Sequence, residues 1–227
     1  MGTASSREPA VLVIPAPAIG PTQSGGIRLE TFAEPLRIGT HMSGFGRPWF
    51  IAGGWAIDLF LGRLTRKHED IDIAILRRDQ YHLMRHLSGW EFMKVVPHNG
   101  HTLEPWRPNE WLDLPIHEVH ARRRGTPSDR LEILLDEADD ETWSFRRNSA
   151  VRRSLSRIGM TTQAGIPILS PEIVLLYKAA EPHDKNQADF ENVWGSLEPE
   201  RRAWLAQALV TCYPSGHPWL EAKMTTA

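Results

Sequence analysis

A chain of 227 residues is long enough to bury a sizeable core, as one large domain or as a catalytic domain followed by a small helical one. Its formal net charge of −2 argues against non-specific electrostatic binding to nucleic acid, so we expect no nucleic-acid partner. One cysteine, Cys212, excludes an internal disulfide framework, and no apolar run reaches the roughly 18 residues of a membrane span. We therefore expect a cytoplasmic protein without membrane contact.

The first two thirds of the chain predict strands interspersed with helices. Residues 1–26 contain proline and glycine clusters and are expected to form a mobile extension. Runs of apolar residues with the period of a strand or of a helix follow. In chain order they predict a helix at 28–42, a strand at 48–52, a helix at 55–61, a strand at 70–76, a helix at 78–87, a hairpin of 90–96 and 101–106 that turns at Asn99-Gly100, and strands at 116–122, 131–135 and 142–147.

The last third predicts helices. Serine followed by proline is typical of a helix start, with the serine as cap and the proline in the first turn. The helices expected here begin at Ser170-Pro171 and span about 185–195 and 199–212. The pattern is therefore α/β first and helical later, with a boundary near residue 165.

Two aspartates in the predicted strand at 70–76 indicate a metal site. Asp70 and Asp72 are two positions apart, so their side chains point the same way and lie roughly 6–7 Å from each other at about 3.3 Å of rise per residue. Two unpaired carboxylates would repel each other, and a divalent cation between them removes that repulsion. The alternative is a solvated edge of the sheet.

A glycine pair precedes the aspartates. Gly53 and Gly54 lie where the strand at 48–52 gives way to the next helix, and such a junction lets backbone N–H groups approach a phosphate. By itself such a pair before a helix is usually just a turn. Followed about sixteen residues later by Asp70 and Asp72, it favours a nucleotidyltransferase, in which Mg²⁺ assists attack on a nucleoside triphosphate.

The string Gly-Gly-Trp-Ala-Ile-Asp…Gly-Arg-Leu-Thr-Arg-Lys-His-Glu-Asp-Ile-Asp-Ile, within 53–75, closely resembles the aminoglycoside nucleotidyltransferases that modify the 2''-hydroxyl. It is also similar to small lincosamide nucleotidyltransferases, and both groups belong to the DNA polymerase β-like nucleotidyltransferase superfamily. The resemblance implies an α+β fold with a mixed β-sheet flanked by helices. Together with the pattern along the chain, it predicts a catalytic domain at 27–165 and a helical region at 166–227. It also implies two Mg²⁺ ions and transfer of a nucleoside monophosphate with release of pyrophosphate.

The resemblance calls for a third carboxylate on a neighbouring strand. Glu132 supplies one among apolar residues, where a charge is costly, and it would act beside Asp70 and Asp72 as metal ligand, as general base or as both. The alternative is the solvated face of an edge strand. In the families resembled, residues equivalent to Arg66 and His68 lie beside the phosphates, although in isolation they would be read as a solvated loop.

The helical region resembles the part of these enzymes that closes over the nucleotide. Lys178 would suit the triphosphate, and Asp189 would hold a basic residue or the acceptor. Lys185 is a nucleotide-binding candidate or part of a charged helix face, and Asn186 follows it where many relatives have aspartate. Asp58 is interpreted as a residue that favours the positive end of its helix, and we leave it out of the catalytic set.

We therefore predict Mg²⁺-dependent transfer of a nucleoside monophosphate, by default AMP, to a hydroxyl of an aminoglycoside, a lincosamide or a related natural product. A cationic acceptor needs an acidic cleft, for which the candidates are Glu104, Glu110, Asp113, Glu118 and the run at 136–141. Two alternatives stay open: a toxin-type enzyme acting on tRNA or protein, and a nucleotide-binding homologue without chemistry, against which the intact Asp-x-Asp argues. The sequence leaves open a monomer or a homodimer.

Overall fold

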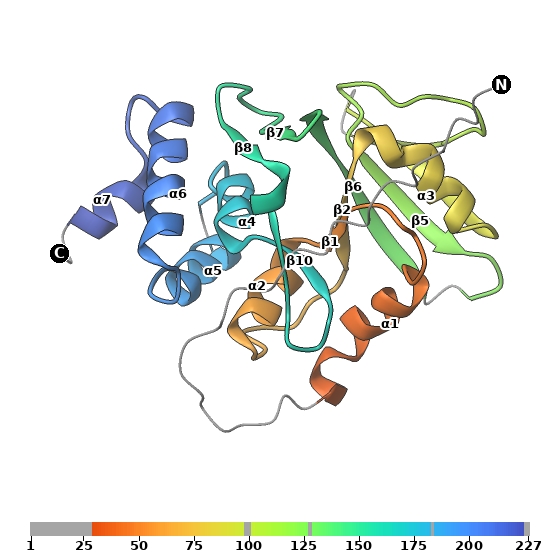
Figure 1. Ribbon diagram of the computed structural model, residues 1–227, viewed down its shortest axis with the longest axis horizontal. Coiled ribbons are helices and arrows are strands. Elements are labelled where there is room, and N and C mark those ends of the chain that lie inside the picture. The colour runs from red at the N-terminus through yellow and green to blue at the C-terminus, as the bar shows by residue number, and fades with distance from the viewer. Residues whose placement is uncertain (1–28, 98–100, 127–128, 183, 225–227) are drawn as a thin grey trace, which may run out of the picture.

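A mixed sheet of ten strands forms the centre of the described chain, residues 29–97, 101–126, 129–182 and 184–224 of the computed structural model (Figure 1). The strands are β1 (Trp49–Ile51), β2 (Asp72–Leu76), β3 (Trp90–Val96), β4 (Thr102–Pro105), β5 (Glu118–Arg123), β6 (Arg130–Asp139), β7 (Thr142–Ser144), β8 (Arg152–Ser154), β9 (Gly159–Thr161) and β10 (Pro167–Leu169). Their order is β4-β3-β5-β6-β2-β1-β10-β9, with β7 and β8 continuing from β6. The sheet is mixed because β2 is parallel to β6 and antiparallel to β1, which is parallel to β10.

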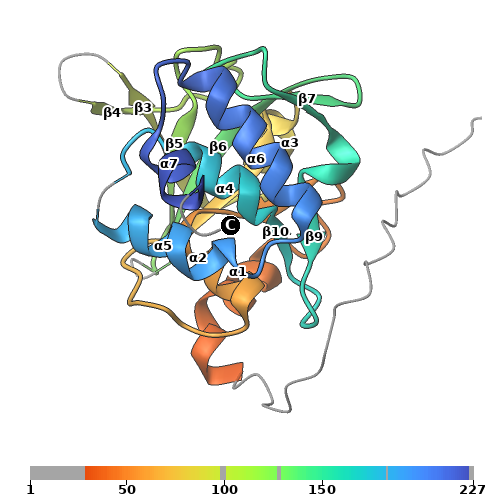
Figure 2. The ribbon, with the colours of Figure 1, turned by 90° about the vertical axis from the view of Figure 1, so that its left-hand side faces the viewer.

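Helices flank this sheet and extend beyond it. They are α1 (Ala33–His41), α2 (Gly53–Leu61), α3 (Gln80–His86), α4 (Pro171–Lys178), α5 (Asp184–Trp194), α6 (Pro199–Cys212) and α7 (Pro218–Met224), with single 3₁₀ turns at Leu29–Phe32, Arg77–Asp79 and Leu155–Arg157. In Figure 1, α4 to α7 gather on the side of the sheet where β10 lies, and Figure 2 shows α5, α6 and α7 from that side. None of the described helices is both long and apolar enough to cross a membrane.

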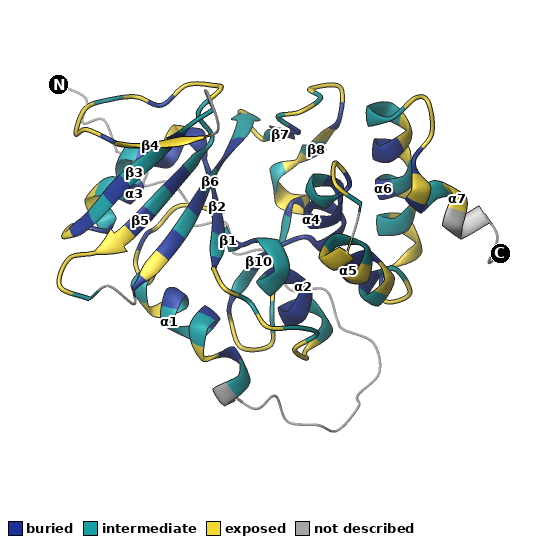
Figure 3. Cartoon of the chain, turned by 180° about the vertical axis from the view of Figure 1, so that it is seen from behind, coloured by how far each residue is buried: buried dark blue, intermediate teal, exposed yellow. Residues whose placement is uncertain are grey.

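The strand β2 runs through the core. Four of its five residues, from Ile73 to Leu76, are buried in succession, as expected for a central strand that is covered on both faces. Figure 3 shows this burial along the central strands and the contrasting exposure of the edge strand β4. Asp72 is the first residue of β2, so it lies where the buried run opens to the surface.

The helix α2 begins two residues earlier than the apolar pattern predicts. Gly53 and Gly54 form its first turn rather than a linker, because Gly53 has a φ of +58° that connects the end of β1 directly to the helix. The helix ends at Gly62, whose φ of +67° is the left-handed conformation typical of a helix C-terminus. The glycine pair is therefore at a helix N-terminus, as predicted.

Three short strands and one helix have no counterpart in the sequence prediction. The strands β8, β9 and β10 have three residues each and contain charged residues, glycine or proline in place of an apolar run, and α7 lies beyond the last predicted helix. β10 is the most important of them, because it adds a parallel neighbour to β1. The predicted extension at 1–26 and the turn at Asn99-Gly100 lie outside the described residues, and the division near residue 165 stays a prediction.

Ser170 and Pro171 begin α4 as predicted, but the serine does not cap the helix with its side chain. Ser170 is fully buried, and its hydroxyl instead donates to the carbonyl oxygen of Arg157 at 3.3 Å. Tertiary packing has therefore redirected the side chain that the sequence assigned to the helix end.

Candidate active site

Three predicted carboxylates come together at one end of two neighbouring strands. Asp72 and Glu132 are partners in the parallel pairing of β2 with β6, and Asp70 lies in the segment that leads into β2. On its other side β6 pairs antiparallel with β5, so Glu132 lies inside the sheet rather than at an edge. The edge-strand alternative for Glu132 is therefore wrong, because β6 is paired on both sides.

Burial and repulsion between carboxylates raise the pKa values of Asp72 and Glu132. The pKa of Asp72 rises from the ordinary 3.8 to about 7, first because the group is buried and then because Glu132 and Asp70 repel its charge. Burial also raises the pKa of Glu132, where His120 opposes the shift and Asp70 and Glu118 reinforce it. Such a group of oxygen ligands with excess negative charge fits Mg²⁺, which prefers carboxylate oxygens.

The two glycines are required by what packs against them. A β-carbon at Gly53 would lie 2.0 Å from the Oδ2 of Asp72, so the glycine lets the helix start approach this carboxylate. A β-carbon at Gly54 would lie 2.3 Å from the Nη2 of Arg66 and 2.6 Å from the Cε1 of His68. The first N–H groups of a helix have no partner within it, so this junction offers donors beside Asp72.

The loop between α2 and β2 is fastened to the buried Asp58. The backbone N–H and the hydroxyl of Thr65 donate to its Oδ1 at 3.1 and 2.5 Å, and the Nε2 of His68 donates to its Oδ2 at 2.6 Å. The His68 ring also lies 4.4 Å from the ring of Trp55, whose Nε1 donates to the carbonyl oxygen of Asp70 at 3.0 Å. These bonds fix the backbone that carries Asp70.

The interpretation of Asp58 as a helix-end residue is wrong. Asp58 lies in the interior of α2, and its side chain is fully buried, because it serves as the acceptor for Thr65 and His68. A signal was present in the sequence: a carboxylate between Ile57 and Leu59 on an apolar helix needs polar partners. Contact of His68 with a phosphate stays a prediction.

A second cluster joins the loop to the C-terminal helices. The carboxylate of Asp189, on α5, is 1% exposed and has the Nζ of Lys178 at 2.9 Å and the Nη2 of Arg66 at 3.6 Å from its Oδ2. Lys178 also donates to the Oδ1 of Asn186 at 3.0 Å. Asp189 therefore holds two basic residues, which was one of its two predicted roles, and one of them, Arg66, lies close to Gly54.

Two cavities adjoin these groups. The first cavity, of about 690 Å³, is lined by residues that include Glu34, Trp55, His68, Glu69, Asp70, Glu91, His120, Arg122, Arg130 and Glu132. The second cavity, of about 320 Å³, is lined by residues that include Gly53, Arg147, Tyr177, Lys178, Lys185 and Asn186. Asp72 lies between the two cavities. It is the strand partner of Glu132, which lines the first cavity, and it packs against Gly53, which lines the second.

Most of the acidic residues predicted to line an acceptor cleft lie elsewhere. Glu104 and Glu110 pair with Lys94, and Asp113 accepts a hydrogen bond from Trp111. Asp136 is buried, and its Oδ1 accepts the hydroxyl of Tyr177 at 2.7 Å. Of the named candidates Glu118 lies beside the site, where it contacts His120, a residue to which the sequence assigned no role.

Comparison with known proteins identifies the family. Residues 36–193 match the family described as Aminoglycoside-2''-adenylyltransferase. A 2''-aminoglycoside nucleotidyltransferase from Escherichia coli is 37% identical over 87 residues, which are 35% of this chain and 49% of that protein. The chain thus spans about half the length of the curated relatives it matches.

Solved structures share the fold. A solution structure of the antibiotic-resistance factor ANT(2'')-Ia aligns with a TM-score of 0.53 and 18% identity, over 87% of this chain and 100% of that one. A crystal structure of ANT(2'')-Ia in complex with adenylyl-2''-tobramycin aligns with a TM-score of 0.50 and 19% identity, over 78% and 97%. The likeness confirms the predicted mixed sheet with flanking and C-terminal helices. The family match spans more than half of the chain, which therefore belongs to the aminoglycoside-2''-adenylyltransferase family of nucleotidyltransferases, as the string within 53–75 predicted.

Proposed function

We propose that this protein transfers a nucleoside monophosphate, with AMP as the predicted group, from a nucleoside triphosphate to a hydroxyl of a small antibiotic or a related natural product. The observation that carries the proposal is the position of Asp72, which pairs with Glu132 across the strands and packs against Gly53. The proposed metal ligand, Asp72, thereby lies between the proposed base, Glu132, and the glycine at the helix start that is proposed to bind phosphate. Membership of the family supports the same chemistry.

The second cavity is the proposed site of the triphosphate. The N–H groups of Gly53 and Gly54 lie at a helix N-terminus, which attracts anions, and Lys178 and Lys185 line the same cavity. Arg66, held near Gly54 by Asp189, adds a further positive charge. Fixed positive charge of this kind stabilises the charge that develops as pyrophosphate leaves.

Asp70 and Asp72 are the proposed ligands of Mg²⁺, with Glu132 beside them. The raised pKa of Asp72 supports this assignment, because a carboxylate held among other carboxylates gains most from a cation. When bound, Mg²⁺ supplies positive charge to the α-phosphate and to the departing pyrophosphate. Two ions are expected, as in the superfamily.

Glu132 is the proposed general base. Its raised pKa brings it closer to neutral pH, and its side chain, 30% exposed, lines the first cavity, where the acceptor would lie. The acceptor oxygen forms a bond to the α-phosphorus, the bond from that phosphorus to pyrophosphate breaks, and the hydroxyl proton passes to Glu132. Asp58 and Trp55 act indirectly, by fixing the loop that carries Asp70.

The first cavity supports a small, cationic acceptor. A volume of about 690 Å³ is in the range of small-molecule sites, which favours a small molecule over tRNA or protein. Besides Glu132, the glutamates Glu34, Glu69 and Glu91 line it together with Asp70. The curated relatives act, by their names, on aminoglycosides, whose amino groups would pair with such carboxylates.

The test is pyrophosphate release with Mg²⁺ and each of the four ribonucleoside triphosphates, measured against aminoglycosides and lincosamides. Release that depends on one acceptor, and that falls to background in Asp72→Asn, is the expected result. Asp139→Asn is the matched control, since Asp139 lies at the exposed far end of β6. Triphosphate binding without release against this panel would reject these acceptors, and absence of triphosphate binding would overturn the proposal.

A further inference from the structure

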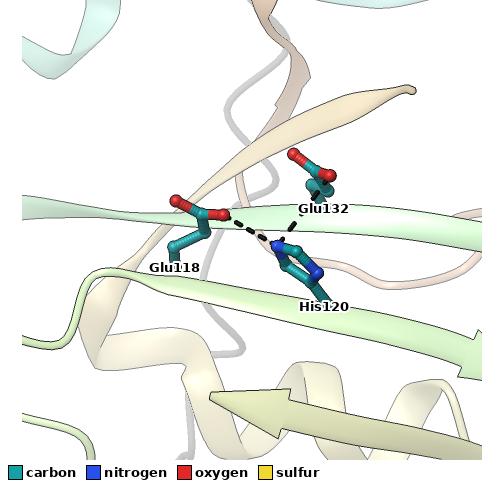
Figure 4. Close-up of side chains that lie close together, drawn as sticks. All are labelled: Glu118, His120 and Glu132. Carbon is teal, nitrogen blue, oxygen red and sulfur yellow. Dashed lines mark hydrogen bonds and ion pairs between the residues drawn. The ribbon is translucent and has the colours of Figure 1, made fainter. Parts of the chain in front are cut away.

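A histidine and two glutamates converge beside the proposed base. Glu118 and His120 are two positions apart on β5, so their side chains share a face of the sheet. His120 is the partner of Glu132 in the antiparallel pairing of β5 with β6. Figure 4 shows the imidazole of His120 between the two carboxylates, with its Nε2 directed toward them.

The distances fit a metal ion held by one atom of each side chain. The Nε2 of His120 lies 2.8 Å from the Oε1 of Glu118 and 3.8 Å from the Oε1 of Glu132. The three potential ligand atoms all lie within 4.8 Å of one another. In a tetrahedral zinc site with bonds of about 2.0–2.1 Å, ligand atoms are separated by roughly 3.4 Å. Small side-chain rotations would therefore complete the site.

The environment leaves room for such an ion. The side chains of Glu118, His120 and Glu132 are 30%, 38% and 30% exposed, and the last two line the first cavity. Glu118 and Glu132 place two carboxylates beside one imidazole, and Asp70 and Glu118 repel the charge of Glu132. A cation at Nε2 would neutralise this charge more fully than the histidine alone.

We propose that Glu118, His120 and Glu132 form a binding site for a zinc-type divalent cation, distinct from the Asp70–Asp72 pair and sharing Glu132 with it. An imidazole nitrogen with two carboxylates suits Zn²⁺ and disfavours Mg²⁺, which prefers ligand sets made of oxygen. Three protein ligands would leave a fourth position for water or a substrate, as in other zinc sites with three protein ligands, and two of the three, His120 and Glu132, line the first cavity.

The site has a consequence for catalysis, and this consequence rests on the proposed function. Zn²⁺ bound to the carboxylate of Glu132 would withdraw electron density from it and so reduce its ability to accept the proton of the acceptor hydroxyl. Zn²⁺ at this site would therefore inhibit transfer even when Mg²⁺ is in excess. In His120→Gln, inhibition by Zn²⁺ should need at least about tenfold more metal, since the variant lacks the ligand that distinguishes the two ions.

The binding itself is tested without nucleotide or acceptor. Zn²⁺ alone is titrated into the full chain by calorimetry, and Co²⁺, whose visible spectrum reports coordination by nitrogen and oxygen, is titrated in parallel. We expect wild type to bind one Zn²⁺ tightly. In His120→Gln the dissociation constant for Zn²⁺ should rise by more than roughly 10–100-fold, which is the loss typical when only an outer-shell partner of a ligand is removed. Asp72→Asn should retain the site, and an excess of Mg²⁺ should not displace the zinc.

The controls separate this site from incidental zinc binding. His82→Gln removes a histidine of α3 whose side chain is 42% exposed, and it should bind Zn²⁺ as wild type does. Glu118→Gln provides a second test of the site if His120→Gln does not fold, as judged by circular dichroism. Binding that is unchanged in His120→Gln and Glu118→Gln, or lost in Asp72→Asn alone, would overturn the proposal, whether or not the protein transfers nucleotides.

Discussion

Gly53 and Asp72 are in such close contact that a β-carbon on the glycine would lie 2.0 Å from the carboxylate oxygen Oδ2. Gly53 also has a φ of +58°, so both its conformation and its surroundings exclude a side chain. The start of α2 and the start of β2 are thereby held against each other. In the proposed reaction this contact places the phosphate cradle next to the metal ligand.

Gly53→Ala is therefore expected to abolish pyrophosphate release and to reduce the free energy of unfolding. The left-handed backbone alone costs roughly 1–2 kcal/mol for a residue with a β-carbon, and displacement of Asp72 adds to it. Gly44→Ala is the control, because Gly44 has a φ of +76° but a β-carbon there would meet nothing within 4 Å. Denaturant unfolding and activity should separate the two variants; equal stability and equal activity would contradict the importance of the contact.

The raised pKa of Asp72 predicts how stability depends on pH without divalent cations. In the unfolded chain the carboxyl ionises near 3.8, and in the folded protein near 7, so the folded state holds an extra proton between these values. The stabilisation by this proton is complete below about pH 4 and is lost as the pH rises through about 7. Its upper bound is about 1.4 kcal/mol for each unit by which the pKa is shifted.

The measurement compares wild type with Asp72→Asn in chelator from pH 5 to pH 8. As the pH rises, the unfolding free energy of wild type should fall relative to that of Asp72→Asn, because the amide of the variant has no charge to desolvate. Mg²⁺ should reverse the trend in wild type by binding the ionised form. A difference that does not depend on pH would show that Asp72 titrates normally.

Asp58→Ala is expected to destabilise the loop that carries Asp70. It leaves the half-buried Thr65 and the side chain of His68 without their acceptor, which costs about 3 kcal/mol of unfolding free energy in total. Activity should fall as well, although Asp58 lines neither the first nor the second cavity. Lys67→Ala, at an exposed position of the same loop, should change stability by less than about 0.5 kcal/mol. Wild-type activity in Asp58→Ala would rule out a positioning role.

Lys178→Met is expected to weaken triphosphate binding selectively. Loss of a charge-assisted contact costs about 1.5–3 kcal/mol, which corresponds to roughly a 10–100-fold rise in the KM for the nucleotide, while the KM for the acceptor stays constant. Lys94→Met is the control, because Lys94 pairs with Glu104 and Glu110 and lines neither the first nor the second cavity. Steady-state kinetics with one substrate varied at a time tests this, and a rise in the acceptor KM instead would reassign Lys178.

Features that depend on residues close together in the sequence were the easiest to predict. Gly53, Gly54, Asp70 and Asp72 could be proposed as site residues because each pair is local, and the mixed sheet followed from the family that these residues resemble. That resemblance led us to expect Glu132 beside Asp72, but only the pairing of β2 with β6 shows that the two residues are direct partners.

The residues that sequence reasoning missed depend on contacts between distant segments. His120 faces Glu132 only because β5 pairs antiparallel with β6, and no local pattern distinguishes it from an ordinary strand histidine. Asp58 was misread because its partners Thr65 and His68 follow in a loop without periodicity. β10 escaped prediction because its three residues begin with a proline and lead directly into the predicted helix start at Ser170.

The pairing of β10 with β1 also sets the order in which the molecule can assemble. Ile51 pairs with Ile168, so the wall of the second cavity that contains Gly53 meets the wall that contains Lys178 only after most of the chain has been synthesised. Contacts between such distant segments form late and slowly in folding. The segment that contains Asp70 and Asp72 is therefore synthesised well before the segment that contains Lys178, and the second cavity forms only after both are present.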